Sequence, residues 1–399
     1  MKDNYADSKS DLFAIFIEKC GEMIKTNAYQ AMITQHAWMF LASFEKLRIK
    51  MMQNDIVNMA HLGARAFEEI GGEVVQTTSF IIRKGKVKEY QGTYCRLIEA
   101  TTQKDKENMF LAGRNRYTAE QENYPKIPGS PIAYWASEAI LNLYDGTLSL
   151  GELCEVKTGI QTGSNERFVR LWFEPKIEKI GFDFHEYDEI LISQKKWFPY
   201  NKGGEFRKWY GNNLYIVNME NGGESIKSYS NNYRLRDPRL YFKFLITWSF
   251  ISSTNFSVRY CPNGFLFDVA GSSIFPTEEN VYYMIGILCS KVIFQCLKIQ
   301  NPTLNFQVED IQKLPIITQF PQKELVDDLV MSCINYSMLD WDSFEISWNF
   351  KIHPLIVSRT KNEMSANDGE WRYRMEDVFF CWKKECETRF LDLKANEEE

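Results

Sequence analysis

The strongest structural pattern in the sequence runs from Tyr29 to Leu62 and reads YQAMITQHAWMFLASFEKLRIKMMQNDIVNMAHL. Tyr29 to Thr34 is a short apolar run of strand length, and Asp55 to Leu62 is a second one. Between them, residues 42–53 carry apolar side chains at helical spacing. A strand, a helix and a strand in this order are typical of an open α/β sheet.

The flanking sequence extends this pattern in both directions. Upstream, a helix is expected to begin after Asp11, which is a good N-cap residue, and to end before Asn27. Downstream, residues 74–83 and 90–98 are rich in β-forming residues, and the glycine between them predicts an antiparallel pair of strands. The α/β region of residues 1–100 is short, so we expect half of a sheet rather than a whole one.

Beyond residue 100 the composition and the residue pattern of the sequence change. Residues 101–145 are first charged and then turn-rich, which predicts a linker followed by a helix. Residues 146–318 combine short apolar runs with glycine turns and predict a second, mixed α/β domain, whose clearest helix covers 282–297. Residues 319–399 carry tryptophans among charged residues and are expected to be largely helical.

The composition is that of a globular protein, with 44% hydrophobic and 25% charged residues. Aromatic residues reach 15%, and they can either build a core or stack on nucleic-acid bases. Nine cysteines form no Cys-x-x-Cys pair and are accompanied by four histidines, so we expect reduced thiols and no metal site. Because the sequence shows neither a signal-peptide pattern nor an apolar run long enough for a bilayer, we expect a cytoplasmic protein.

The charge is distributed unevenly although the net charge is only −6. Between Lys195 and Tyr260, eleven Lys and Arg residues face four acids, whereas the chain ends in the acidic run Asn396–Glu399. Cations alternate with aromatic rings in the basic region, which suits DNA phosphates and bases, and the alternative is a solvated face over packed rings. The candidate DNA-binding residues of this region are Lys195, Lys196, Trp197, Arg207, Lys208, Trp209, Arg234, Arg236 and Arg239.

Four stretches in chain order carry a family resemblance. They read SDLFAIFIEK (10–19) with YQAMIT (29–34), GIQTGSNERF (159–168), NPTLNFQVEDI (301–311) and DWDSFEISWNF (340–350). The first resembles the segment that follows the catalytic Asn-Pro-Pro-Tyr loop of gamma-type adenine-N6 DNA methyltransferases. The second and third resemble the beginning and the close of the target-recognition domain of these enzymes. The fourth is similar to the PglX family of BREX phage-defence systems and narrows the resemblance to it.

The resemblance implies both a fold and a function. Residues 1–100 would be the C-terminal half of a class I, Rossmann-like methyltransferase sheet, and 146–318 would be the target-recognition domain that binds double-stranded DNA. S-adenosylmethionine would be the methyl donor of the full-length family, which acts in phage defence and restriction-modification. Phe80 lies where the family has a motif near the flipped base, and a buried strand position is the alternative. Thr162, Ser164 and Asn165 could offer backbone N–H groups to a phosphate, or form an ordinary turn.

The sequence also departs from the family pattern. It holds neither the Gly-rich cofactor turn nor the Asn-Pro-Pro-Tyr loop, and its one Asn-Pro pair, Asn301–Pro302, continues with Thr303. We therefore expect a fragment without N-terminal and C-terminal parts, with no catalytic residues, no turnover and no S-adenosylmethionine binding by itself.

Three hypotheses remain open for such a chain. It could recognise DNA for an N-terminal methyltransferase half on another chain. It could be a non-enzymatic DNA-binding or assembly module that docks on other BREX proteins, or an inactive truncated gene product.

Overall fold

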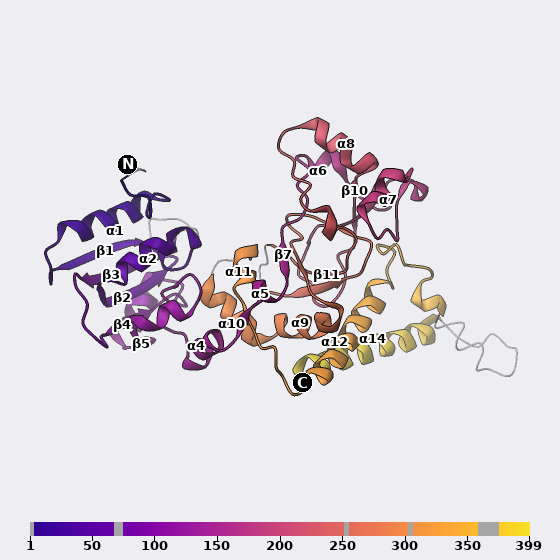
Figure 1. Cartoon of the computed structure of the whole chain (residues 1–399). Coiled ribbons are helices and arrows are strands. Elements are labelled where there is room, and N and C mark those ends of the chain that lie inside the picture. Colours follow the sequence, from indigo (N-terminus) through magenta and orange to yellow (C-terminus); the bar gives the residue numbers. More distant parts are fainter. Residues whose placement is uncertain (1–3, 68–74, 251–254, 302–305, 358–374) are drawn as a thin grey trace, which may run out of the picture. The chain divides into compact units, whose positions relative to one another are not determined.

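The computed structural model describes residues 4–67, 75–250, 255–301, 306–357 and 375–399. The protein is a mixed α/β structure with several sheets, and it divides into two compact units. Unit 1 comprises Met1–Leu148 and Gln295–Thr303, and unit 2 comprises Ser149–Phe294 and Leu304–Glu399 (Figure 1).

Unit 1 is built on a five-stranded sheet. Its strands are β1 (Tyr29–Gln35), β2 (Asp55–Gly63), β3 (Thr77–Arg83), β4 (Gln91–Arg96) and β5 (Arg116–Glu120). They lie in the order β1-β3-β2-β4-β5. Strand β3 is antiparallel to both β1 and β2, β4 is parallel to β2, and β5 is antiparallel to β4. Strands β1, β2 and β4 therefore run in one direction, so their carboxyl ends lie at the same end of the sheet.

The helices of unit 1 are short. They are α1 (Leu12–Met23), η1 (Ala37–Met39), η2 (Ala42–Phe44), α2 (Glu45–Met51), α3 (Gln103–Leu111), η3 (Gln121–Lys126) and α4 (Glu138–Asp145). The side chain of Asp11 accepts a hydrogen bond from the Phe13 N–H, so α1 begins where the sequence predicts. The predicted strand, helix and strand between residues 29 and 62 are β1, α2 and β2. Buried residues such as Ile17, Trp38 and Leu47 join this crossover into one core.

A buried arginine on α2 ties the connection between β1 and α2 to the loop that contains Gly129. Arg48 is fully buried, and its Nη1 donates to the carbonyl oxygens of Trp38 and Leu41, each at 2.8 Å. Its Nε and Nη2 both donate to the Gly129 carbonyl, at 3.0 and 2.6 Å. Burial lowers the pKa of this guanidinium to about 10, so it stays charged near neutral pH.

Two predictions for the first part of the chain are wrong. The segments 74–83 and 90–98 do not pair with each other, because β2 lies between β3 and β4 in the sheet. The expected linker of residues 101–130 contains α3 and β5, and Tyr124 and Ile127 within it are buried. Edge strand β5 alternates half-buried and exposed side chains, so its sequence resembles a polar connection.

The strands of unit 2 are short and belong to several sheets. Two four-stranded sheets have the orders β13-β9-β10-β8 and β12-β11-β14-β7, and β15 pairs with β6. Their bounds are β6 (Leu148–Ser149), β7 (Glu155–Lys157), β8 (Val169–Leu171), β9 (Trp197–Asn201), β10 (Tyr215–Asn218), β11 (Leu245–Trp248), β12 (Val258–Cys261), β13 (Leu266–Phe267), β14 (Ser273–Phe275) and β15 (Pro315–Ile316). This is the mixed α/β texture expected for the second domain.

Helices surround these sheets. They are α5 (Leu150–Leu153), α6 (Asn165–Phe168), η4 (Ile177–Lys179), α7 (Tyr187–Ile192), α8 (Glu220–Tyr229), η5 (Pro238–Leu240), η6 (Glu278–Asn280), α9 (Val281–Leu288), α11 (Val308–Gln312), α12 (Lys323–Trp341) and α14 (Met375–Glu398). Helix α10 (Lys291–Gln300) begins in unit 2 and belongs to unit 1 from Gln295 onward. Figure 1 shows α6, α7 and α8 at one end of unit 2, and α9, α12 and α14 at the other. The C-terminal segment is largely helical as expected, but α12 packs on α9 and α14, so it belongs to unit 2.

The single helix predicted for residues 282–297 is two helices, α9 and α10, with a bend of 72° between them. Ser290 causes the break, because its hydroxyl accepts a hydrogen bond from the Ile293 N–H at 3.2 Å and so caps the start of α10. Within the described ranges, no single helix has the length and apolarity needed to cross a bilayer. The bent pair α9–α10 meets that test only when its two helices are taken together.

Candidate functional site

Two of the predicted stretches meet beside α6. The backbones of Gln161 and Arg234 exchange two hydrogen bonds, each 2.8 Å long. Close by, Nε of Arg236 donates to the Gly159 carbonyl at 3.2 Å. The turn of residues 159–165 and the loop of residues 233–239, here called the arginine loop, therefore form one surface of unit 2. About seventy residues separate them in the sequence.

The turn itself is closed by its own side chains. The Thr162 hydroxyl donates to Oδ1 of Asn165 at 2.8 Å and accepts the Ser164 N–H at 3.2 Å. Thr162 is 2% exposed, so neither this hydroxyl nor that N–H is free to hold a phosphate. The geometry favours the ordinary turn for Thr162, while Ser164 is half-buried and Asn165 exposed beside the arginines.

The three arginines of the loop differ in how their charge is compensated. Arg239 pairs with Asp237, whose carboxylate also accepts the Arg239 backbone N–H at 3.1 Å. Arg234 is exposed, and its Nη1 donates to the carbonyls of Asn231 and Tyr233. In the part of the chain that the structure describes, no carboxylate pairs with Arg234 or Arg236. These two guanidinium groups are available to an anion.

A second group of predicted residues lies at the start of β9. Lys195 donates to the Glu178 carbonyl at 2.8 Å, and Lys196 lies 3.7 Å from the Glu220 carboxylate. The half-buried ring of Trp197 lies 6.0 Å from the Arg170 guanidinium and 5.9 Å from the Lys196 ammonium. A ring with two cations near it suits contact with a nucleic acid, because cations meet phosphates and an aromatic ring can stack on a base. Arg170 was not among the residues predicted from the sequence.

The third group, Arg207, Lys208 and Trp209, contacts the C-terminal helices. Lys208 pairs with Glu397 of α14 at 3.2 Å, and Arg207 pairs with Asp340 of α12 at 3.5 Å. Trp209 is 5% exposed, and its indole N–H donates to Glu397. These residues therefore meet carboxylates of the same chain, and they lie beside α12 and α14 rather than beside α6.

Phe80 lies apart from all three groups, in unit 1. It is 1% exposed at the middle of β3, and its ring centroid is 5.2 Å from that of Trp38. This placement favours a core position, which was the alternative to a contact with a flipped base.

A histidine pair that sequence analysis did not single out occupies the carboxyl ends of the parallel strands in unit 1. His36 follows β1, His61 lies near the end of β2, and their Nδ1 and Nε2 atoms are 2.8 Å apart. Burial lowers the pKa of His36 to about 4. Burial, followed by the nearby His36 and cations, lowers the pKa of His61 well below its ordinary value. Both rings are therefore neutral near pH 7, and ligand sites of open α/β sheets occur at this end of the strands.

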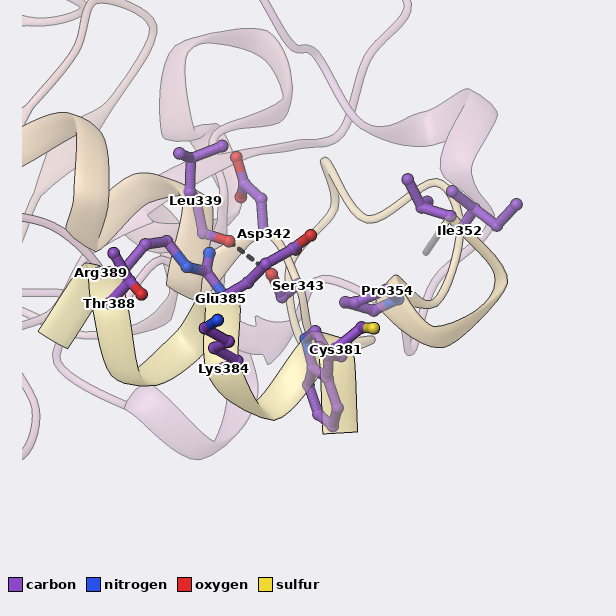
Figure 2. A pocket seen from close by; sticks show the side chains of 12 residues that line it. Leu339, Asp342, Ser343, Ile352, Pro354, Cys381, Lys384, Glu385, Thr388 and Arg389 are labelled. Atoms are coloured by element: carbon purple, nitrogen blue, oxygen red, sulfur yellow. Dashed lines mark hydrogen bonds between the residues drawn. The ribbon is translucent and has the colours of Figure 1, made fainter. Parts of the chain in front are cut away.

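A cavity of about 740 Å³ lies between the end of α12, the segment 352–357 and α14. Figure 2 shows Asp342, Ser343 and Pro354 on one side and Lys384, Glu385 and Arg389 of α14 on the other. Residues of the 340–350 motif thus help to line it, but none of the predicted DNA-binding residues does.

The motif also anchors the C-terminal segment to the rest of unit 2. Trp348 packs against Phe182 and Phe265, with ring centroids 5.5 Å away in each case. The third motif, 301–311, falls partly on residues 302–305, which lie outside the described residues. Within the described ranges, no three His, Cys, Asp or Glu side chains gather as a metal site.

Comparison with known proteins places this geometry in a family context. Residues 1–67 match the family model of the Eco57I restriction-modification methylase. The chain is 42% identical to the adenine-specific methyltransferase PglX of Lacticaseibacillus casei (strain Zhang), over 99% of this chain and 33% of that protein. The chain is therefore a relative of the PglX methyltransferases.

A second relative supports the same relationship. The adenine-specific methyltransferase BrxX of Escherichia coli O9:H4 (strain HS) is 39% identical over 89% of this chain and 29% of that protein. The chain spans about a third of the length of these PglX-type relatives.

Among solved structures, the DNA complex of the type IIL restriction-modification enzyme MmeI aligns with a TM-score of 0.49 at 10% identity, over 95% of this chain and 52% of that one.

Proposed function

We propose that this chain is the part of an adenine-N6 DNA methyltransferase that recognises the DNA target and supplies the back half of the catalytic sheet. Unit 2 would be the target-recognition domain, and unit 1 would belong to the class I, Rossmann-like methyltransferase domain. The enzyme would act in phage defence or restriction-modification with S-adenosylmethionine as its methyl donor.

The observation that carries the proposal is the similarity to PglX and BrxX, which runs through both units rather than through one. The site geometry supports it. Among the described residues, no carboxylate pairs with Arg234 or Arg236 beside the 159–165 turn, and two cations lie near the Trp197 ring at the start of β9. Arginine suits a DNA-recognition surface, because its planar guanidinium group binds phosphates and can also form two hydrogen bonds with guanine.

The proposal also explains what this chain would not do by itself. Methylation of the adenine amine in a duplex requires base flipping, which costs a few kcal/mol, and groups that then position the amine. Such positioning is worth roughly 7–11 kcal/mol in favourable cases. The sequence has no Asn-Pro-Pro-Tyr loop to provide it, so we expect methylation only together with a chain that carries this loop.

The test is co-expression of this chain with a second chain that carries the Gly-rich cofactor turn and the Asn-Pro-Pro-Tyr loop of a gamma-type adenine-N6 DNA methyltransferase. N6-methyladenine in plasmid DNA is then measured, and the matched control replaces the loop asparagine with alanine. We expect methylation with the intact pair and background levels with the control or with either chain alone.

Binding of the chain to duplex DNA, measured as a function of salt, distinguishes the alternatives. A log–log dependence of affinity on salt without methylation would point to a non-enzymatic binding or assembly module. Absence of both methylation and DNA binding would contradict the proposal.

A further inference from the structure

We propose that Lys208 and Trp209 form an oxyanion site for a DNA phosphate, and that the carboxylate of Glu397 occupies this site until DNA displaces it. The inference rests on the proposed DNA-recognition role of unit 2. It adds a site, its competing ligand and a means of regulating binding.

Two donors converge on one oxygen in this site. The indole N–H of Trp209 donates to Oε1 of Glu397 at 2.6 Å, and Nζ of Lys208 lies 3.2 Å from the same oxygen. A carboxylate oxygen and a phosphate oxygen are both anionic acceptors, and both bind charged and N–H donors at such distances. The donor geometry therefore fits a phosphate oxygen as well as it fits Glu397.

Trp209 is held by the sheet and not by the helix that carries Glu397. The backbone N–H of Trp209 donates to the Val258 carbonyl at 3.1 Å, and the backbone carbonyl of Trp209 accepts the Tyr260 N–H at 2.8 Å. Trp209 is thus fixed beside strand β12. Its indole N–H would stay in place after Glu397 leaves, so the site is preorganised for a new ligand.

A buried cation behind the site raises its preference for anions. Arg259 on β12 is 1% exposed, and its Nη1 donates to the Ser249 hydroxyl at 3.2 Å and weakly to the Arg207 carbonyl at 3.5 Å. Its Nε and Nη2 are buried and have no hydrogen-bond partner among the described residues. Burial lowers its pKa to about 10, so the group remains charged at neutral pH.

The carboxylate that fills the site is accessible to exchange. The side chains of Lys208 and Glu397 are 25% and 31% exposed, so water and salt reach the pair. A cavity of about 370 Å³ adjoins them, and its wall includes Arg389 and Arg207, the latter paired with Asp340 on the same wall. An incoming phosphate would meet these two further cations as it replaces Glu397, and partly exposed pairs of this kind contribute only about 1 kcal/mol.

The test compares four forms of the protein by fluorescence anisotropy with a mixed-sequence 20-base-pair duplex at low salt. They are the wild type, E397Q, E398Q and the double variant K208Q/E397Q. E397Q removes the competing charge but keeps an acceptor for the Trp209 N–H, so the fold is preserved. E398Q makes the same change of charge on the next residue of α14, which pairs only with Lys394 among the described residues.

We expect E397Q to bind DNA roughly three- to tenfold more tightly than the wild type, because a competing charged hydrogen bond is lost. E398Q should change affinity less than about twofold. The double variant K208Q/E397Q should lose the gain, because the ammonium that binds the phosphate is gone.

The outcomes separate this inference from the proposed function. Equal binding by the wild type, E397Q and E398Q would overturn the oxyanion site and leave DNA recognition intact. Equal gains for E397Q and E398Q would reduce the effect to net charge and would also overturn it. No binding by any form, with melting temperatures unchanged, would overturn both.

Discussion

Nδ1 of His36 lies 2.8 Å from Nε2 of His61, and Nδ1 of His61 lies 3.3 Å from the hydroxyl oxygen of Tyr134. In this contact between two neutral imidazoles, one nitrogen carries the hydrogen and the other accepts it. If the Tyr134 hydroxyl donates to Nδ1 of His61, then Nε2–H of His61 donates to Nδ1 of His36, so each of these two contacts has one donor and one acceptor. The three groups join the ends of β1 and β2 to the segment that follows η3, and protonation of either ring would place a charge where burial disfavours it.

This pair predicts an acid-sensitive unit 1. The pKa of His36 is about 4 in the folded protein and 6.5 ordinarily, so the unfolded chain binds more protons between these values. The stability contributed by the neutral ring is fully present above pH 6.5 and is lost as pH falls through 4. We expect a loss on the order of 3 kcal/mol from His36 in the free energy of unfolding.

The measurement is urea unfolding of the full chain between pH 7.5 and 4.5. Substitution H36N keeps a hydrogen-bonding side chain without the titration, so it should flatten the dependence on pH. The matched control is H185Q, because His185 is exposed and its variant should follow the wild type. Parallel curves for H36N and the wild type would show that another group causes the acid sensitivity.

Arg48 gives a second prediction, on stability alone. R48M keeps the length of the side chain but removes four hydrogen bonds to the carbonyls of Trp38, Leu41 and Gly129. Removal of a buried charge offsets part of the loss, so we expect the free energy of unfolding to fall by roughly 2–4 kcal/mol. Chemical denaturation measures it, with K46M as the control, since Lys46 on the same helix is 79% exposed. A similar loss in K46M would refute the role of these hydrogen bonds.

Gly159 gives a third prediction, within the motif that resembles the start of the target-recognition domain. A Cβ atom at this position would lie 2.0 Å from the Phe267 carbonyl oxygen, which accepts the Ile160 N–H. G159A must push these backbones apart, so we expect a loss of roughly 2 kcal/mol or more. G146A is the control, because its Cβ would lie 3.3 Å from the Asn142 carbonyl oxygen, a contact that a shift of a few tenths of an ångström relieves. Equal melting temperatures for G159A and the wild type would contradict the close approach.

Local signals in the sequence predicted local structure well. Asp11 marks the start of α1, and apolar spacing located β1, α2 and β2. Pairing over long distances left no such signal. Nothing in the sequence near Gly85 distinguishes a hairpin from a connection that leaves β2 between β3 and β4.

The same limit applies to the candidate sites. The basic run and the acidic end of the chain are both visible in the sequence, but the contact of Trp209 with Glu397 joins residues 188 positions apart. His36 and His61 are 25 positions apart and become neighbours only through the sheet. Sequence therefore indicated which charges could bind DNA, but it could not show which of them the protein itself already neutralises.

The arginine loop offers the most direct test of DNA recognition, because two of its members are uncompensated and the third is paired. Arg239 is bound by Asp237, whereas Arg234 and Arg236 contact only carbonyl groups among the described residues. R234Q and R236Q should each weaken duplex binding roughly threefold to tenfold, and each should lower the log–log salt slope by about 0.9 if it removes one phosphate contact. R239Q should leave the affinity and the salt slope nearly unchanged, because Arg239 binds Asp237 and not a DNA phosphate. The substitution then breaks a pair within the protein and removes no contact with DNA.

The measurement is DNA affinity at several salt concentrations, with mixed-sequence duplexes. A uniform loss across sequences identifies phosphate contacts, whereas a loss restricted to some sequences identifies base readout. If R239Q weakens binding as much as R234Q and R236Q do, the Asp237 pair does not govern which arginine meets DNA. The loop would then act only through its total charge.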